Sequence, residues 1–147
     1  MPSNEIKDGL LRVCAELNSN GVEYLVIGGA AVNHCGFSRP SGIGGQHAHL
    51  KVDLDFWYNP TENYFERLIN ALEDLEIDTE DLQTIVFDKK RTFIKIPYEH
   101  FHTDFLPVIE GIDPFRTCLN RADILTIKEI SIPILSLDDL IKNKQFL

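Results

Sequence analysis

The pattern of apolar and polar positions divides the chain into short helices and strands. Apolar residues recur at helical spacing in some stretches, while β-branched and aromatic residues cluster in others, with Gly, Pro and Asn between them. Helices or helical turns are predicted over residues 6–17, 30–35, 61–72, 113–119 and 136–140. Strands are predicted over residues 23–27, 51–57, 84–87, 92–96, 101–106, 123–127 and 129–134.

The order of these elements indicates the fold class. Helices and strands alternate early in the chain and strands cluster late, which is typical of an α/β or α+β fold with a small mixed β-sheet flanked by helices. The segments 84–87 and 92–96 flank the charged stretch Asp88–Arg91 and are predicted to form a hairpin. No repeat or internal boundary interrupts the sequence, so residues 1–147 are expected to form a single domain.

The charge balance limits the expected partners. The chain has 14 basic and 23 acidic residues, which gives a net charge of −9. An acidic protein binds nucleic acids and anionic membranes poorly, because such binding depends on neutralising phosphates. No apolar run approaches the about 20 residues of a membrane span. Three scattered cysteines without a CxxC spacing are typical of a reduced, cytoplasmic protein.

The strand around Asp53 and Asp55 carries the main candidate chemistry. Alternate strand residues face opposite sides, so these two carboxylates share one face while Val52, Leu54 and Phe56 share the other. Two adjacent acids repel each other, and a divalent metal ion between them would explain the placement. Solvated acids on an edge strand are the alternative explanation, although the surrounding apolar residues favour a buried strand.

Two further motifs fit such a site. Gly28 and Gly29 lie between a strand and a helix, where glycine lets the backbone pass close to a phosphate. Asp104 lies on a later strand and could bind a second metal ion or take a proton from an attacking hydroxyl. His102 would share a face with Asp104, either beside the site or as a half-buried histidine.

These motifs resemble those of the nucleotidyltransferase superfamily related to DNA polymerase beta. The resemblance lies in the stretch 26–31, in Asp53-Leu54-Asp55 and in Asp104, and the closing stretch 134–142 is also similar to a segment common in that group. The chain looks most like the small stand-alone bacterial and archaeal members, including the toxins of toxin–antitoxin pairs.

The resemblance implies a function and a set of site residues. It implies a metal-dependent enzyme that moves a nucleoside monophosphate from a nucleoside triphosphate (NTP) to an acceptor hydroxyl. In this reading Asp53, Asp55 and Asp104 are catalytic and bind two Mg²⁺ ions, while Gly28 and Gly29 position the nucleotide. ATP is the first nucleotide to test. The alternative is an inactive nucleotidyltransferase-like binding module that acts through a protein partner, such as an antitoxin or a second subunit.

The Gly- and His-containing loop over residues 38–49 leaves further interpretations open. Arg39 could meet a phosphate or be solvated, and Lys51 could contact a substrate phosphate or lie on the surface. A zinc site is a weaker hypothesis, since the candidate ligands match no closed structural pattern. Those candidate ligands are His34, Cys35, His47 and His49.

Overall fold

The computed structural model describes residues 2–34, 52–99 and 101–146 of the chain. Its elements, in order, are α1 (Pro2–Ser19), β1 (Tyr24–Ile27), α2 (Gly28–His34), β2 (Val52–Tyr58), α4 (Glu62–Asp74), the 3₁₀-helix η1 (Leu82–Thr84), β3 (Ile94–Pro97), β4 (Phe101–Leu106), α5 (Phe115–Asn120), β5 (Asp123–Ile127), β6 (Ile130–Ile134) and α6 (Leu137–Phe146). None of the helices in these ranges is long and apolar enough to cross a membrane.

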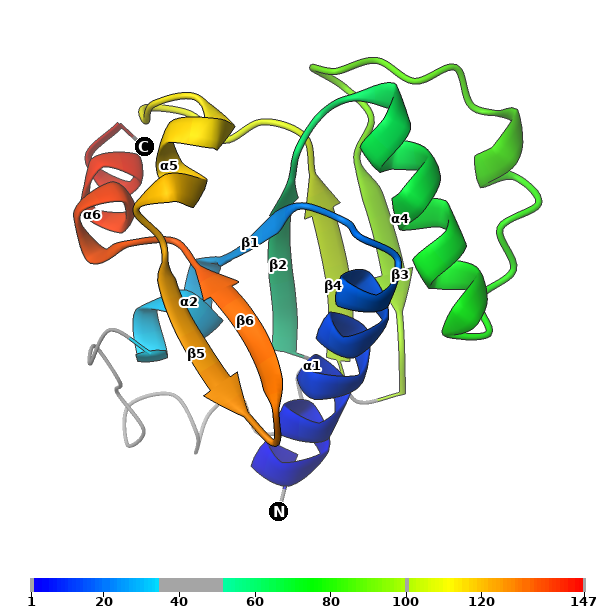
Figure 1. Cartoon of the computed structure of the whole chain (residues 1–147), viewed down its shortest axis with the longest axis horizontal. Helices are drawn as coiled ribbons and strands as arrows, with labels where there is room; N and C mark the ends of the chain where they lie inside the picture. The colour runs from blue at the N-terminus through cyan, green and yellow to red at the C-terminus, as the bar shows by residue number, and fades with distance from the viewer. Residues whose placement is uncertain (1, 35–51, 100, 147) are drawn as a thin grey trace.

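The described strands form one mixed six-stranded sheet in the order β3-β4-β2-β1-β6-β5 (Figure 1). The pairs β2–β4 and β1–β6 are parallel, and the other three neighbouring pairs are antiparallel. Helices α1 and α4 pack against each other in front of the sheet in Figure 1, while α2 packs on β1, β2 and α6. The prediction of a small mixed sheet flanked by helices is confirmed.

One face of the central strands is mainly apolar and aromatic. Phe56 of β2 stacks on Phe105 of β4 with 5.1 Å between ring centroids, and Tyr24 of β1 meets Phe56 edge-on at 5.9 Å. All three side chains are almost completely buried. Because strand side chains alternate, burying this face fixes the register and places the neighbouring Asp53 and Asp55 on the opposite face.

The ends of two helices match the sequence prediction. Thr61 caps α4, its side-chain oxygen accepting a hydrogen bond from the Tyr64 backbone N–H at 3.2 Å. Ser136 caps α6 in the same way, accepting from the Asp139 N–H at 3.2 Å. Such caps satisfy backbone donors that have no partner inside the helix.

The predicted hairpin of residues 84–87 with 92–96 is wrong. Residues 82–84 form η1, and residues 85–87 lie outside the sheet. Phe87 instead packs on Phe65 of α4, with 5.2 Å between ring centroids. β3 pairs antiparallel with β4, where Ile94 and Ile96 are buried. β3 therefore forms a short hairpin with the strand that follows it, closed by a 2.8 Å hydrogen bond from the Tyr98 N–H to the Phe101 carbonyl, and not with the segment that precedes it.

Candidate active site

The strand register brings the predicted acids together on one face of the sheet. Asp55 of β2 lies directly opposite Asp104 of β4, although 49 positions separate them in the sequence. Asp53 lies opposite His102 in the same parallel pair, and Lys95 of β3 lies opposite Asp104 on the other side. β2 is an internal strand of the sheet, so solvated acids on an edge strand do not explain the pair.

The far end of the same face is closed by an aromatic contact. Trp57, two residues after Asp55, is buried and meets Phe115 of α5 edge-on at 5.0 Å. Its indole N–H donates to the Pro107 carbonyl at 3.0 Å. The face is therefore apolar and covered at Trp57, while the Asp53 side chain remains 51% exposed. This contrast leaves the acids at the accessible end.

Gly28 is fitted directly against Asp55. β1 ends with Ile27 opposite Asp55, and Gly28 follows with a left-handed φ of +69°. A Cβ atom at this position would lie 2.5 Å from Asp55 Oδ2, well inside contact distance. A Cβ atom on Gly29 would meet nothing within 4 Å. Both the backbone conformation and the lack of space for a Cβ atom thus require glycine at position 28, whereas the exposed position 29 meets no such restriction from the described residues.

Asp55 has a strongly perturbed carboxyl group. Burial, followed by the charge of Asp104 and a hydrogen bond with it, raises the pKa of Asp55 to about 6. The charge of Asp53 acts in the same direction, and that of Lys95 opposes it. Carboxylates placed this close resist ionising together unless a cation joins them. Such perturbation by burial and a named charge partner is common at functional sites.

The carboxylate of Asp104 is buried, and its negative charge is only partly balanced by a neighbouring cation. Its side chain is 12% exposed, and Lys95 Nζ lies 3.6 Å from its Oδ1. This is too long for a hydrogen bond, and Oδ1 has no hydrogen-bond partner within the part of the chain that the structure describes. Buried polar atoms are nearly always paired, so a buried oxygen without a hydrogen-bond partner needs an explanation, and a bound cation would provide one.

Asp53 interacts with a different partner. Its Oδ1 lies 3.3 Å from Nδ1 of His102, which is partly buried on the neighbouring strand. His102 therefore adjoins the site, which is the first of the two placements expected for it. The imidazole can orient the Asp53 carboxylate as a hydrogen-bond donor.

Two of the three acids fit a divalent cation as they stand. Asp55 and Asp104 offer adjacent carboxylates, an unpaired buried oxygen and a charge repulsion that a cation would relieve. Among the side chains that the structure describes (residues 6–31, 53–99 and 101–143), however, no three His, Cys, Asp or Glu residues are grouped so as to hold a metal ion. Asp53 would have to rotate away from His102 to complete a three-carboxylate set.

Some predicted site residues are not located. Arg39 and Lys51 lie outside the described residues, as do Cys35, His47 and His49 of the zinc hypothesis. Lys95 is the site residue that the sequence did not reveal, because it belonged to a predicted hairpin. Its polar side chain alternates with buried Ile94 and Ile96, which would have placed it on the open face once β3 was paired with β4.

Comparison with known proteins supports the fold. No protein-family model and no curated protein matches the sequence. Among solved structures, the chain is similar to a Thermotoga maritima protein described as a "putative nucleotidyltransferase". The TM-score is 0.61 at 14% sequence identity, over 99% of this chain and 85% of the other. The fold is therefore nucleotidyltransferase-like. At 14% identity, this likeness concerns the arrangement of the backbone alone.

Proposed function

We propose that this chain, built on a nucleotidyltransferase-like fold, is a metal-dependent nucleotidyltransferase. It moves a nucleoside monophosphate from an NTP to an acceptor hydroxyl. The observation that carries the proposal is the side-by-side placement of Asp55 and Asp104 on the accessible face, directly beside the Gly28 turn. A core position gains nothing from two neighbouring carboxylates, whereas a nucleotide bound with Mg²⁺ uses both.

The proposed reaction assigns a role to each acid. The acceptor oxygen bonds to the α-phosphorus of the NTP, the bond from that phosphorus to the leaving pyrophosphate breaks, and the acceptor loses its proton. Asp53 and Asp55 would hold Mg²⁺, with Asp104 joining at one of the two ion positions. Mg²⁺ supplies charge neutralisation for the phosphates. Asp104, whose Oδ1 has no hydrogen-bond partner among the described residues, would receive the acceptor proton.

The surrounding groups would bind and orient the substrate. Gly29 follows the Gly28 turn at the start of α2, and no described atom lies within 4 Å of its Cβ position, so a triphosphate could approach the backbone there. Lys95, half-exposed next to Asp104, can neutralise phosphate charge, and Arg39 and Lys51 remain candidates for the same task. The net charge of −9 disfavours a large RNA as the acceptor.

A transfer assay tests the enzymatic proposal. The chain would be incubated with Mg²⁺, NTPs labelled at the α-phosphate and candidate acceptors: tRNA, proteins and small hydroxyl compounds. We expect label to move to one acceptor class, and Asp55→Asn and Asp104→Asn to abolish the transfer. Transfer that persists in both variants would contradict the proposal.

An inactive binding module is the second candidate, and the Asp53–His102 contact favours it. That contact holds one of the three acids away from a common metal position. Such a module would act through a protein partner, as in toxin–antitoxin pairs. It would label no acceptor in the transfer assay, and its partner would copurify with it from the source cells.

A further inference from the structure

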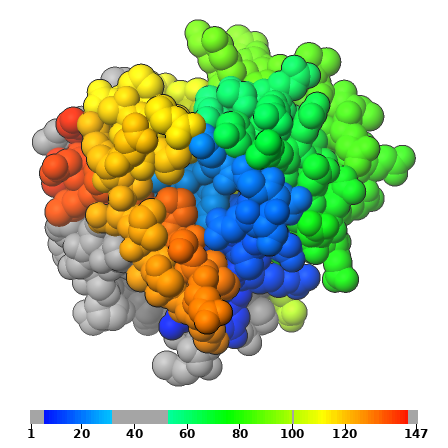
Figure 2. Space-filling model, in the orientation of Figure 1, coloured from blue at the N-terminus to red at the C-terminus, as the bar shows by residue number. Residues whose placement is uncertain are grey.

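Residues 76–91 form a surface in which acidic, apolar and basic segments follow one another. In Figure 2 this green part of the chain projects at the upper right. Its apolar segment, residues 85–87, is the stretch whose sequence predicts a strand but which lies outside the sheet. We refer to residues 76–91 with the adjoining side of α4 as the α4 surface.

The apolar segment combines a projecting side chain with a groove. Val86 is 89% exposed and Ile85 is 43% exposed. Both side chains lie at the wall of a cavity of about 400 Å³ that is also lined by Ile69, Leu82 and Phe87, together with Glu62 and Glu66. An exposed apolar residue next to an apolar groove is unusual on a chain that acts alone.

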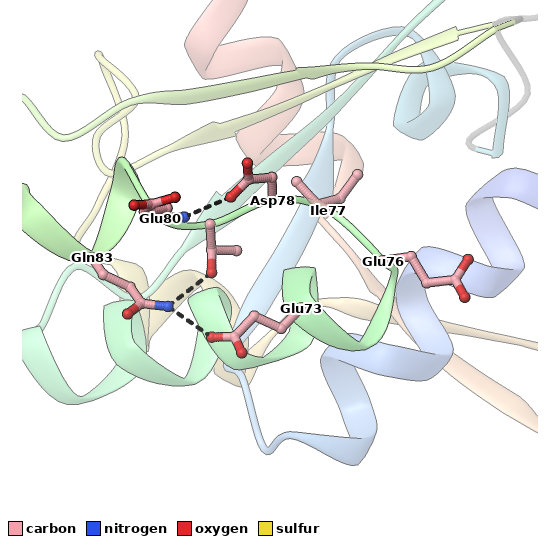
Figure 3. Close-up of a pocket in the computed structure, with 7 residues that line it drawn as sticks. Glu73, Glu76, Ile77, Asp78, Glu80 and Gln83 are labelled. Carbon is pink, nitrogen blue, oxygen red and sulfur yellow. Dashed lines mark hydrogen bonds between the residues drawn. The ribbon is translucent and has the colours of Figure 1, made fainter.

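The acidic segment lies at one end of the groove. A second cavity of about 550 Å³ is lined by Glu73, Glu76, Asp78 and Glu80 (Figure 3). The two cavities meet at Gln83, whose amide donates to Glu73 at 3.2 Å. The apolar groove therefore continues directly into a negatively charged hollow.

The basic segment lies at the other end. Lys89, Lys90 and Arg91 are exposed, and none forms an ion pair with another described residue. The turn is fixed by Asp88, whose side chain accepts from the Lys90 N–H at 2.9 Å and whose own N–H donates to the Thr92 hydroxyl at 2.8 Å. The three cations are thus presented on a well-defined turn.

We propose that the α4 surface is a homodimer interface related by a two-fold axis near Val86. A two-fold axis at the apolar segment pairs each end of the surface with the opposite end of the second copy. The basic turn of one protomer then faces the acidic hollow of the other, and Val86 of each enters the apolar groove of its partner. The surface is self-complementary in both shape and charge, which selects a second copy as its occupant.

Substitution of Val86 tests the apolar contact. Val86→Asp changes an exposed side chain, so the fold should be unaffected, as circular dichroism would verify. The matched control is Ile124→Asp, since Ile124 is 60% exposed on β5, at the other edge of the sheet. Sedimentation equilibrium over the micromolar range should show dimers for wild type and Ile124→Asp. Val86→Asp should dissociate at least about tenfold more readily.

Charge exchange tests the orientation of the two copies. Lys89→Glu with Lys90→Glu should weaken the dimer, and so should Glu76→Lys with Glu80→Lys. The chain that carries all four substitutions regains the wild-type net charge of −9 and should dimerise like wild type. Failure of the combined variant to recover would overturn the proposed pairing.

Two other results would overturn the interface itself. A wild-type chain that stays monomeric over this concentration range would exclude a second copy as the occupant of the groove. Loss of the dimer in Ile124→Asp but not in Val86→Asp would place the interface on the β5 edge.

Discussion

Gly28 and Gly29 are adjacent in the sequence, and alanine substitution should affect them in opposite ways. Alanine at position 28 must adopt the left-handed φ of +69°, which costs about 1–2 kcal/mol for a residue with a Cβ atom. The Cβ atom would also lie 2.5 Å from Asp55 Oδ2, so the carboxylate must leave its rotamer at a cost of about 1 kcal/mol. Together these terms destabilise Gly28→Ala by about 2–3 kcal/mol.

Gly29→Ala is the matched control. Its Cβ atom meets nothing within 4 Å, and its φ is not in the left-handed region. Alanine is preferred to glycine in a helix, so this variant should be unchanged or up to about 1 kcal/mol more stable than wild type. Each variant gains one methyl group, at neighbouring positions, so the two proteins have the same amino-acid composition.

Thermal and urea unfolding of the metal-free chain provide the assay. A loss of 1 kcal/mol lowers the melting temperature of a chain of this length by about 3 °C, so Gly28→Ala should melt about 6–9 °C below wild type. A Gly28→Ala variant that is as stable as Gly29→Ala would refute the close fit of the glycine turn against Asp55.

Three further expectations follow from other contacts. Arg121→Ala should lower the free energy of unfolding by about 3 kcal/mol, measured by urea unfolding, because the fully buried carboxylate of Asp139 loses its 2.8 Å hydrogen bond from Arg121 Nε. Arg121→Lys keeps the positive charge and should be destabilised by less. Burial and the neighbouring charge of Asp104 raise the pKa of Asp55 from an unfolded value near 4 to about 6. Between these pH values the native state binds a proton that the unfolded state has lost. The free energy of unfolding should therefore fall as the pH rises from 4 to 6. Asp55→Asn should flatten that slope, and an unaltered slope would argue against the shift. In isothermal titration with Mn²⁺ alone, Lys95→Gln should bind the ion several-fold more tightly than wild type. The reason is that the substitution removes a competing positive charge 3.6 Å from Asp104. Weaker binding would contradict this competition and would mean that Lys95 helps to hold the acids in place.

Much of the fold was predictable because local patterns and tertiary packing agree. The alternation around Asp53 and Asp55 placed both acids on one face, and burial of Phe56 on the other face enforces that placement. The caps at Thr61 and Ser136 were predictable for the same reason, since a cap depends on residues within one helical turn.

The pairing of β3, and with it the place of Lys95, could not be predicted because the segments on both sides of this strand, residues 84–87 and 101–106, have the composition of a strand. Residues 84–87 have the composition of a strand, and nothing local shows that β3 pairs with β4 instead. The contact between Asp53 and His102, in contrast, depends on the parallel register of two strands far apart in the sequence. The resemblance to nucleotidyltransferases led to the prediction of Asp53, Asp55 and Asp104 as site residues, but it did not indicate their neighbours His102 and Lys95.

The most direct measurement is isothermal titration of ATP with Mg²⁺ into the wild-type chain and into Asp53→Ala with Asp55→Ala. It needs no knowledge of the acceptor, and it addresses the acids that define the proposed site. Binding to the wild type that is lost in the double variant is the expected result. No binding to the wild type, or equal binding to both proteins, would contradict a nucleotide site on this face of the sheet.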